Sequence, residues 1–588
     1  MNWKPNTNLK METNNLTLTK NKQMKSNIKQ MKSNIKHIIT RIILAIFSLV
    51  IISCRQSDDH ITDPGTETGP ASVKINLQGS DYNDGETSKT TGINGINSAT
   101  VQTEEISFNN NNDYKLVAIL TPVDNISQAS SKTSARAAMT TPLPVNTRYK
   151  VVVFNNSGNY VTEANYISGQ EATATPITGL TGGQSYTFVA YSIGSTTTLP
   201  DITYTNPANK TLTTASVNNV SENSDLMYFS KSLTLDGNKT NFLDIILKHQ
   251  YSQIYAAINS AQTNYYTISS INNAAITPHN SVASLKLSDG STTASGSSSR
   301  TLRFTSNAQN VWAPAVFINT AATTNGILSI GSAVLRKASG FLVTHENIAF
   351  RNLKIIPGTR YILELSFVPN DRYITNFRGY PAVSINGVIF MRHNLGANIS
   401  LNPDAPSVNI AGNYYQWGRK TPVATATTGT GAIPGWNTTV APQGAWNSGT
   451  RTAPIKNTLN DPCPTGWRVI SREEFGTLVD NTTHSYTGNA ATTNIGSAAA
   501  VLTSKFNTSV KVTLPFTGFR EGTDGRFSHA ATGGGTLIDG SYWSADNNSD
   551  IGRIFALFNT TESSFWAAGS GGVNTRATPI RCVAEYPY

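Results

Sequence analysis

Apolar residues follow two distinct patterns along this chain. The first is one continuous run, Ile42–Ile52, in which only Ser48 is polar. The second fills the remainder: short runs rich in Val, Ile, Thr, Tyr and Phe alternate with turns rich in Asn, Gly and Ser. Such runs between turn residues predict strands, and long helical periodicity is scarce. The pattern therefore predicts a mainly β protein.

The strand-like runs group into two successive β-domains, which we place at 73–216 and 217–372. Predicted strands in the first are 114–120, 148–154 and 187–192, and the second contains the apolar run 241–258 and a strand at 362–367. The preceding segment, 54–72, is polar and carries Pro and Gly, which predicts a flexible tether.

The last segment, 376–588, has a different character. It holds six of the eight tryptophans and long stretches rich in Gly, Pro and Asn. Ser471 followed by Glu474 fits the N-cap and capping box of a helix. The change in composition predicts a third, α+β domain.

Residues 1–53 form a basic lead and an export signal. The run Ile42–Ile52 is too short for an ordinary membrane-spanning helix, and a charged start followed by an apolar middle is typical of a signal peptide. A perfect repeat of Gln-Met-Lys-Ser-Asn-Ile-Lys covers 23–36, so translation from Met31 would leave a signal of ordinary length. Residues before Ile42 contribute +8 of the formal +10 charge. The basic balance therefore gives no support for a nucleic-acid partner.

The sequence contains no recognisable set of catalytic residues. Metalloprotease, serine-hydrolase and phosphate-loop motifs are absent, the histidines are scattered, and Glu473 with Glu474 fits a solvated helix start. We expect no enzyme, cofactor or metal. Besides Cys54, the chain has only Cys463 and Cys582, which in an exported domain are more often a disulfide than a metal site. Two buried free thiols remain the alternative.

Two tryptophans leave a choice open. Trp436 and Trp446 stand in loop-like sequence and could line a glycan or protein site, because exposed indole faces stack well on sugar rings. The alternative, which we favour, is that the two tryptophans hold a loop-rich domain together.

Three segments of the chain resemble known protein families and extend this interpretation. Ile51-Ile-Ser-Cys54 resembles the lipobox of bacterial lipoproteins, which implies that Cys54 is lipidated and begins the mature chain; a plain signal peptide or membrane anchor is the alternative. Thr147-Arg-Tyr-Lys-Val-Val-Val-Phe154, Gly183-Gln-Ser-Tyr-Thr-Phe-Val-Ala-Tyr191 and Leu247-Lys-His-Gln-Tyr-Ser252 resemble the fimbrillin-like surface lipoproteins of Bacteroidota. That likeness implies two transthyretin-like β-sandwiches.

The third resemblance covers the last segment. Gly387-Val-Ile-Phe-Met-Arg-His-Asn-Leu-Gly-Ala397, Asp461-Pro-Cys-Pro-Thr-Gly-Trp-Arg-Val469 and Gly540-Ser-Tyr-Trp-Ser544 resemble the Fibrobacter succinogenes major paralogous domain and the wider C-type-lectin-like fold. In that fold a cysteine near a helix start pairs with one in the last strand, and Cys463 and Cys582 occupy those places.

These features together predict a lipid-anchored outer-membrane protein exposed at the cell surface. The expected role is adhesion or fimbria-associated binding without catalysis. Expected partners are the outer membrane through the lipid, fimbrial subunits, and a glycan or host surface protein. The alternative is a glycan-binding lipoprotein of a polysaccharide-uptake system.

Overall fold

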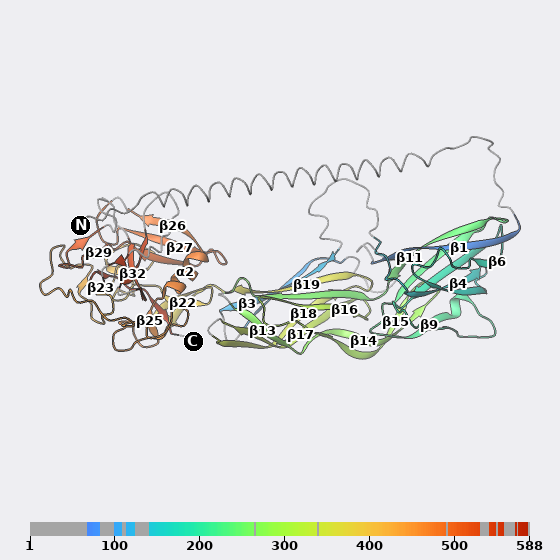
Figure 1. The fold of residues 1–588 in the computed structure, drawn as a ribbon, viewed down its shortest axis with the longest axis horizontal. Helices are drawn as coiled ribbons and strands as arrows, with labels where there is room; N and C mark the ends of the chain where they lie inside the picture. Colours follow the sequence, from blue (N-terminus) through green and yellow to red (C-terminus); the bar gives the residue numbers. More distant parts are fainter. Residues whose placement is uncertain are drawn as a thin grey trace, which may run out of the picture. The chain divides into compact units, whose positions relative to one another are not determined.

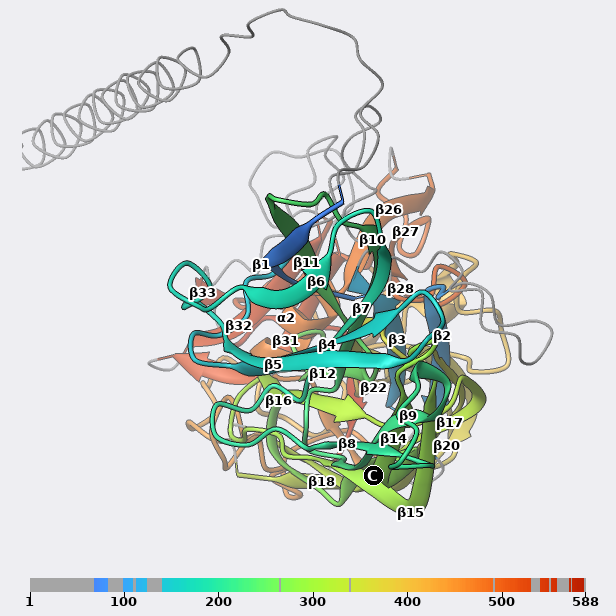
Figure 2. The ribbon, with the colours of Figure 1, turned by 90° about the vertical axis from the view of Figure 1, so that its right-hand side faces the viewer.

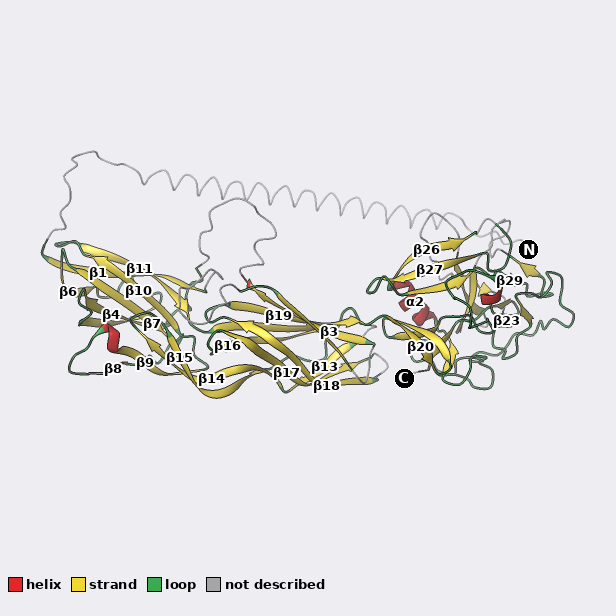
Figure 3. Ribbon diagram, turned by 180° about the vertical axis from the view of Figure 1, so that it is seen from behind, coloured by secondary structure: helices red, strands yellow, loops and turns green. Residues whose placement is uncertain are grey.

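The computed structural model describes residues 68–82, 99–108, 113–123, 140–263, 266–337, 340–489, 492–529, 540–548, 551–557, 571–572 and 574–585. These residues form seven sheets, the helix α2 and short 3₁₀ turns at Leu212–Thr214 and Val408–Ile410 (Figure 3). The prediction of a mainly β protein is confirmed. Of the predicted segments, the signal and nearly all of the tether lie outside the described residues.

The first sheet, sheet A, has the strand order β5-β4-β7-β10-β11-β1-β6 (Figure 2). Its strands are β1 Pro70–Asp81, β4 Arg148–Asn155, β5 Tyr160–Ile167, β6 Ile177–Thr181, β7 Ser185–Ser192, β10 Met227–Thr234 and β11 Thr240–His249. The side chains of β4 are buried from Tyr149 to Phe154, on both faces of the strand. This explains why apolar and polar residues do not alternate in this segment. Its one buried charge, Lys150, pairs with Glu163 of β5 at 2.8 Å.

Sheet B has the order β16-β12-β19-β3-β2, with β2 Gln102–Ser107, β3 Tyr114–Pro122, β12 Ser252–Asn259, β16 Asn310–Ile318 and β19 Arg360–Pro369.

Sheet C has the order β13-β17-β14-β9-β8, with β15 on β14 and β18 on β17. Its strands are β8 Ile202–Tyr204, β9 Ala215–Ser221, β13 Thr267–Asn272, β14 Ala274–Lys286, β15 Thr292–Leu302, β17 Thr323–Arg336 and β18 Leu342–Ile355. Sheets B and C lie side by side in the ribbon (Figure 1), and their side chains share one large core.

Strand pairing crosses the predicted boundary between the two β-domains. Strand β3 was expected to belong to 73–216, but it pairs with β19 over its whole length and so belongs to sheet B. The predicted boundary itself falls inside β9, which pairs with β14. Strand β8 of the first predicted domain pairs with β9, so sheet C contains strands from both predicted domains. The assignment of β3 to the first domain was therefore wrong.

The C-terminal part, which we define as the described residues from Arg372 onward, is built around sheet D. This sheet has the order β20-β21-β22-β35-β25, with β20 Arg372–Phe377, β21 Tyr380–Ile385, β22 Val388–Met391, β25 Trp467–Val469 and β35 Cys582–Ala584. Because β20 begins at Arg372, the predicted start at 376 lies within that strand.

Sheet D is covered on both faces. One core holds α2 Arg472–Asp480 and the sheet of β26 Thr482–Gly488, β27 Ala498–Ser504 and β28 Lys511–Pro515. The other core holds four tryptophans and both cysteines. Smaller strands complete the part: β23 Asn413–Gln416, β24 Ala424–Thr425, β29 Phe519–Arg520, β30 Phe527–Ser528, β31 Gly540–Asn548, β32 Ile551–Leu557, β33 Gly571–Gly572 and β34 Ala577–Thr578.

Acid is expected to weaken the core between sheets B and C through His345 of β18. This side chain is 3% exposed and its ring stacks on Phe108 with centroids 3.9 Å apart. Burial lowers the pKa of His345 from 6.5 to about 4. Between these values the unfolded chain binds more protons than the native protein, so stability falls as the pH falls.

We expect the His345→Phe variant to lose less stability on acidification than the wild type. Between pH 7 and pH 4 the difference in free energy of unfolding should be about 3 kcal/mol, measured by urea titration. Carboxylates elsewhere titrate equally in both proteins and cancel in the comparison. If the free energy of unfolding falls by the same amount in both proteins between pH 7 and pH 4, this expectation is wrong.

Candidate functional site

The predictions made for the three cysteines differ in how far the structure tests them. Cys54 lies outside the described residues, so its lipidation stays a prediction. Cys463 and Cys582 form a disulfide, with their Cα atoms 6.0 Å apart. Both side chains lie in the tryptophan-rich core, where Cys582 belongs to β35 and Cys463 precedes β25.

Trp446 belongs to the core and does not line a site. Its side chain is 1% exposed, its ring lies 5.6 Å from that of Trp417, and its indole N–H donates to the carbonyl of Asn460 at 3.0 Å. A sugar cannot reach a ring enclosed in this way, so the ligand-binding interpretation of Trp446 was wrong. The alternative, that the tryptophan holds the loops together, describes it correctly.

Trp436 is half-buried and is also held in place by its neighbours. Its indole N–H donates to the carbonyl of Gly522 at 3.1 Å. Its ring lies so close to Gly525 that a Cβ atom at that glycine would approach it to 2.2 Å. The glycine is therefore required for this packing. A ligand role for the part of Trp436 that remains exposed stays a prediction.

The helix start at Ser471 is confirmed, but its acidic residues are not simply solvated. Ser471 and Glu474 form the predicted capping box. Glu474 also pairs with the guanidinium of Arg468. Burial alone would raise the pKa of Glu474, but Arg468 and the bonds from Ser471 outweigh it and hold the pKa below its usual value. Because Arg468 belongs to β25, the pair fixes α2 onto sheet D.

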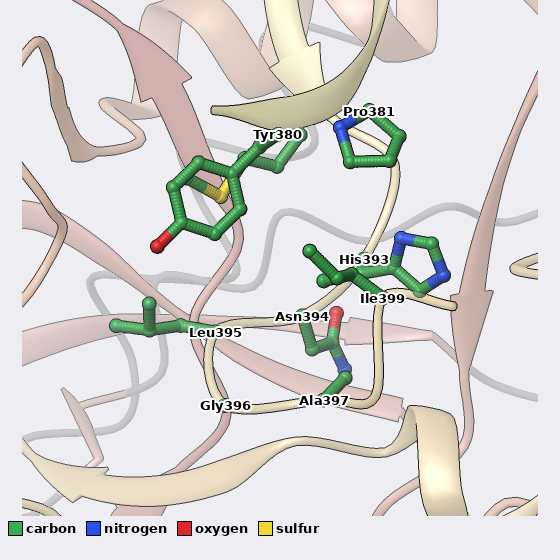
Figure 4. Close-up of a pocket in the computed structure, with 9 residues that line it drawn as sticks. Tyr380, Pro381, His393, Asn394, Leu395, Gly396, Ala397 and Ile399 are labelled. Atoms are coloured by element: carbon green, nitrogen blue, oxygen red, sulfur yellow. The ribbon is translucent and has the colours of Figure 1, made fainter. Parts of the chain in front are cut away.

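The structure brings together an open pocket that sequence reasoning did not identify. It has a volume of about 220 Å³ and lies between β21 and the loop that follows β22 (Figure 4). Its lining residues are Tyr380, Pro381, Met391, His393, Asn394, Leu395, Gly396, Ala397 and Ile399. In Figure 4, Tyr380 and Leu395 lie on one side of the hollow, and Ile399 and His393 lie on the other.

Ion pairing and hydrogen bonding hold the loop that forms the pocket. Arg392 binds Asp404 at 2.6 Å and lies over the ring of Tyr373. His393 donates from Nε2 to the carbonyl of Leu401 at 2.9 Å. Gly396 has a φ of +82°, and a Cβ atom there would lie 2.3 Å from the side chain of Asn413. The loop therefore has a defined shape before any ligand arrives.

Behind the pocket lies Arg581, which is 1% exposed. Its three guanidinium nitrogens donate to the side chain of Asn394 at 3.1 Å and to the carbonyls of Met391 and Thr513, each at 2.8 Å. Burial lowers the pKa of Arg581 to about 10, so the group stays charged at neutral pH. Two of these partners line the pocket, and the arginine therefore supports the pocket from within.

The pocket opens onto an exposed apolar rim. Ile399 is 42% exposed, and Leu401 and Val408 are each 38% exposed. The N–H of Asn398 donates to the carbonyl of Asn409, which brings the segment carrying Val408 close to Ile399. Ile399 itself lines the pocket, so an exposed apolar side chain stands at its mouth. Exposed apolar surface beside a hollow is a feature of interaction sites.

The electrostatics of the pocket favour an uncharged group. Burial lowers the pKa of His393, so the imidazole is neutral at physiological pH. Arg392 is already paired with Asp404. The volume is smaller than that of usual small-molecule sites, which span about 300–1,000 Å³. The pocket therefore has room for one apolar side chain or one sugar ring.

Neither metal chemistry nor membrane insertion is indicated by the described ranges. Within them, no three His, Cys, Asp or Glu residues gather as a metal site. In the same ranges, no helix has both the length and the apolar character needed to cross a membrane.

The pocket residues could have been found only in part from sequence. The segment from Gly387 to Ala397 was noted for its family resemblance, and it does supply Met391 and the pocket loop. Tyr380 and Ile399 come from outside it. Nothing in their local pattern indicates that β21 and the loop would enclose a hollow.

Comparison with known proteins gives distant structural likenesses. No protein-family model and no curated protein matches the chain. The fimbrial anchor protein Mfa2 of Porphyromonas gingivalis is similar at 12% identity and a TM-score of 0.26, over 54% of this chain and 99% of that one. A candidate cell adhesion protein of Bacteroides fragilis is similar at 12% identity and a TM-score of 0.28, over 53% and 96%.

A candidate polysaccharide-binding protein of Bacteroides thetaiotaomicron is similar at 14% identity and a TM-score of 0.24, over 47% of this chain and 80% of that one.

Proposed function

We propose that this protein is a surface lipoprotein that binds a protein partner through the pocket and rim of its C-terminal part. The pocket with its rim of Ile399, Leu401 and Val408 carries the proposal. An apolar side chain of the partner enters the hollow, and the rim packs around it. The removal of these apolar surfaces from water favours binding.

The remainder of the chain suits display at the cell surface. The apolar run before Cys54 and its resemblance to a lipobox support a lipid anchor. The chain enters its first strand, β1, at Pro70, so a short polar tether separates the anchor from sheet A. The resemblance of 73–370 to fimbrillin-like proteins supports a fimbria-associated role. Sheets A to C then carry the C-terminal part, and the protein acts by binding and without catalysis.

Anchoring is tested by the Cys54→Ala variant. Without the sulfur no lipid can be attached, so the variant should leave the membrane fraction and lose the mass of the lipid. Cell fractionation and intact-mass measurement check both expectations. A variant with the wild-type mass and wild-type membrane association would refute the anchor.

Partner binding is tested by placing a charge on the rim. Ile399→Asp and Leu401→Asp should each reduce binding to a captured partner by about tenfold or more, because burying a carboxylate against an apolar group is costly. The wild-type protein, purified from membranes in detergent, is first screened against an array of extracellular host proteins and purified fimbrial subunits. Surface plasmon resonance then measures the affinity of each variant.

Leu459→Asp provides the matched control. Leu459 is 79% exposed and does not line the pocket, so the same chemical change there should leave the affinity unchanged. Equal affinities for the wild type and the Ile399 and Leu401 variants would exclude the pocket. If no protein on the array binds and a separate array of purified glycans does, the alternative role in polysaccharide uptake is favoured.

A further inference from the structure

The outer face of sheet B carries two large aromatic side chains that make no ring contact among the described residues. Trp312 of β16 is 47% exposed and Tyr255 of β12 is 38% exposed. Their neighbours in sequence, Val311, Ile254 and Ala256, point into the core and are completely or almost completely buried. The alternation of a strand therefore places Trp312 and Tyr255 on the same solvent-facing side.

We propose that this face is a saccharide-binding platform, formed by Trp312, Tyr255 and Glu364 around Ala257. Trp312 lies directly opposite Ala257 on the neighbouring strand, and Ala257 lies directly opposite Glu364 of β19. Strands are about 4.8 Å apart, so the Cα atoms of Trp312 and Glu364 are separated by about 10 Å. Because the Ala257 side chain is only a methyl group, it leaves space above the sheet between the Trp312 ring and the Glu364 carboxylate.

This arrangement matches the two chemical faces of a sugar ring. The C–H face of a pyranose packs on an aromatic ring, and its hydroxyls need both donors and acceptors. The Glu364 side chain is exposed and makes no hydrogen bond or ion pair within the described ranges, so its carboxylate can accept from two hydroxyls. Tyr255 lies two residues before Ala257 on β12, opposite Ile362 of β19. There its ring can pack against a second sugar ring of the same oligosaccharide.

The surrounding side chains favour a saccharide over a cationic ligand. Gln253 and Asn259 of β12 and Asn310 of β16 lie near the platform, and their amides can both donate and accept. A cation would need acceptors only and would be better served by an enclosed aromatic cage. Here the rings lie on an open sheet face. A neutral oligosaccharide is therefore the occupant that this chemistry fits.

The proposal is independent of the pocket in the C-terminal part. It rests on sheet B alone, and no residue is shared between the two sites. Strand β16 is an edge strand, and its Pro314 lacks the N–H needed to pair with a further strand. At Trp312 the backbone of this edge is occupied by Thr305, whose N–H donates to the Trp312 carbonyl at 2.9 Å. This bond uses the backbone and leaves the indole face exposed.

Affinity electrophoresis of the full-length protein in detergent tests the platform, with dextran, galactomannan, xyloglucan or yeast mannan cast in the gel. At least one polysaccharide should retard the wild type, and retardation should not change with salt. Trp312→Ala should weaken the affinity about tenfold, the equivalent of one stacking contact of ~1.4 kcal/mol. Trp312→Phe should retain most of the binding, because it keeps an aromatic face.

Phe242→Ala is the matched control, because Phe242 on β11 is 66% exposed and lies in sheet A. It should migrate like the wild type, and circular dichroism should show that each variant is folded. The proposal is overturned if no polysaccharide retards the wild type, or if Trp312→Ala is retarded like the wild type. It is also overturned if only polylysine binds, with an affinity that falls with salt and is lost in Glu364→Gln.

Discussion

Replacing both Cys463 and Cys582 with Ala is expected to lower the free energy of unfolding of the C-terminal part by about 4–5 kcal/mol. The bond links residues separated by 119 positions, and closing so long a loop removes much of the conformational freedom of the unfolded chain. A domain is usually stable by only about 5–15 kcal/mol. The expected loss is therefore a large share of the stability of this part.

Urea titration followed by tryptophan fluorescence measures this loss directly, because Trp417, Trp446, Trp467 and Trp543 lie in the same core as the disulfide. Alanine is chosen so that no polar group is buried in place of the sulfur. Cys54→Ala serves as the cysteine control and should leave the urea midpoint unchanged. A shift of less than about 1 kcal/mol in the double variant would show that the bond contributes little to stability.

The local parts of the fold could be predicted from the sequence because their causes are local. The run 148–154 is bounded by turn residues, and from Tyr149 to Phe154 it is buried on both faces of β4. The start of α2 could be placed because Ser471 and Glu474 satisfy each other's backbone N–H groups. Neither feature depends on a distant residue.

The partners of the strands could not be predicted in the same way. Strand β3 alternates buried and half-buried residues, which shows which of its sides is buried. It does not show which strand lies beside it, and the partner β19 comes more than two hundred residues later. The same limit applies to β14, whose two ends pair with β17 and β9. Pairing depends on the whole set of strands that compete for each edge.

The candidate sites show a related limit. Trp446 and Trp312 are the same residue type, and only their surroundings decide that one is in the core and the other is exposed. A local signal did exist for Trp312, because it stands between Val311 and Ala313 in an alternating strand. If both apolar neighbours face the core, the indole must face solvent. Loop-like sequence around Trp446 gave no such signal.

The second large effect is expected from Arg581→Met, which should destabilise the C-terminal part by about 3–5 kcal/mol. The change leaves the Asn394 side chain and the carbonyls of Met391 and Thr513 buried without their donor. Each such acceptor costs about 1–3 kcal/mol, and removing a buried charge offsets part of the sum. Arg581→Lys keeps the charge but cannot reach all three acceptors, so its loss should be intermediate.

Arg576→Met is the control for this change. Arg576 lies in the same segment, but it is half-buried and pairs with Glu521 at 3.5 Å near the surface. Its replacement should cost less than about 1 kcal/mol. Urea titration compares the three variants, and equal losses for Arg576 and Arg581 would refute a special role for the buried guanidinium. Because Arg581 also holds Met391 and Asn394, its replacement should weaken partner binding under conditions in which the protein is still folded. Arg581 would then couple the stability of the C-terminal part to the shape of its pocket.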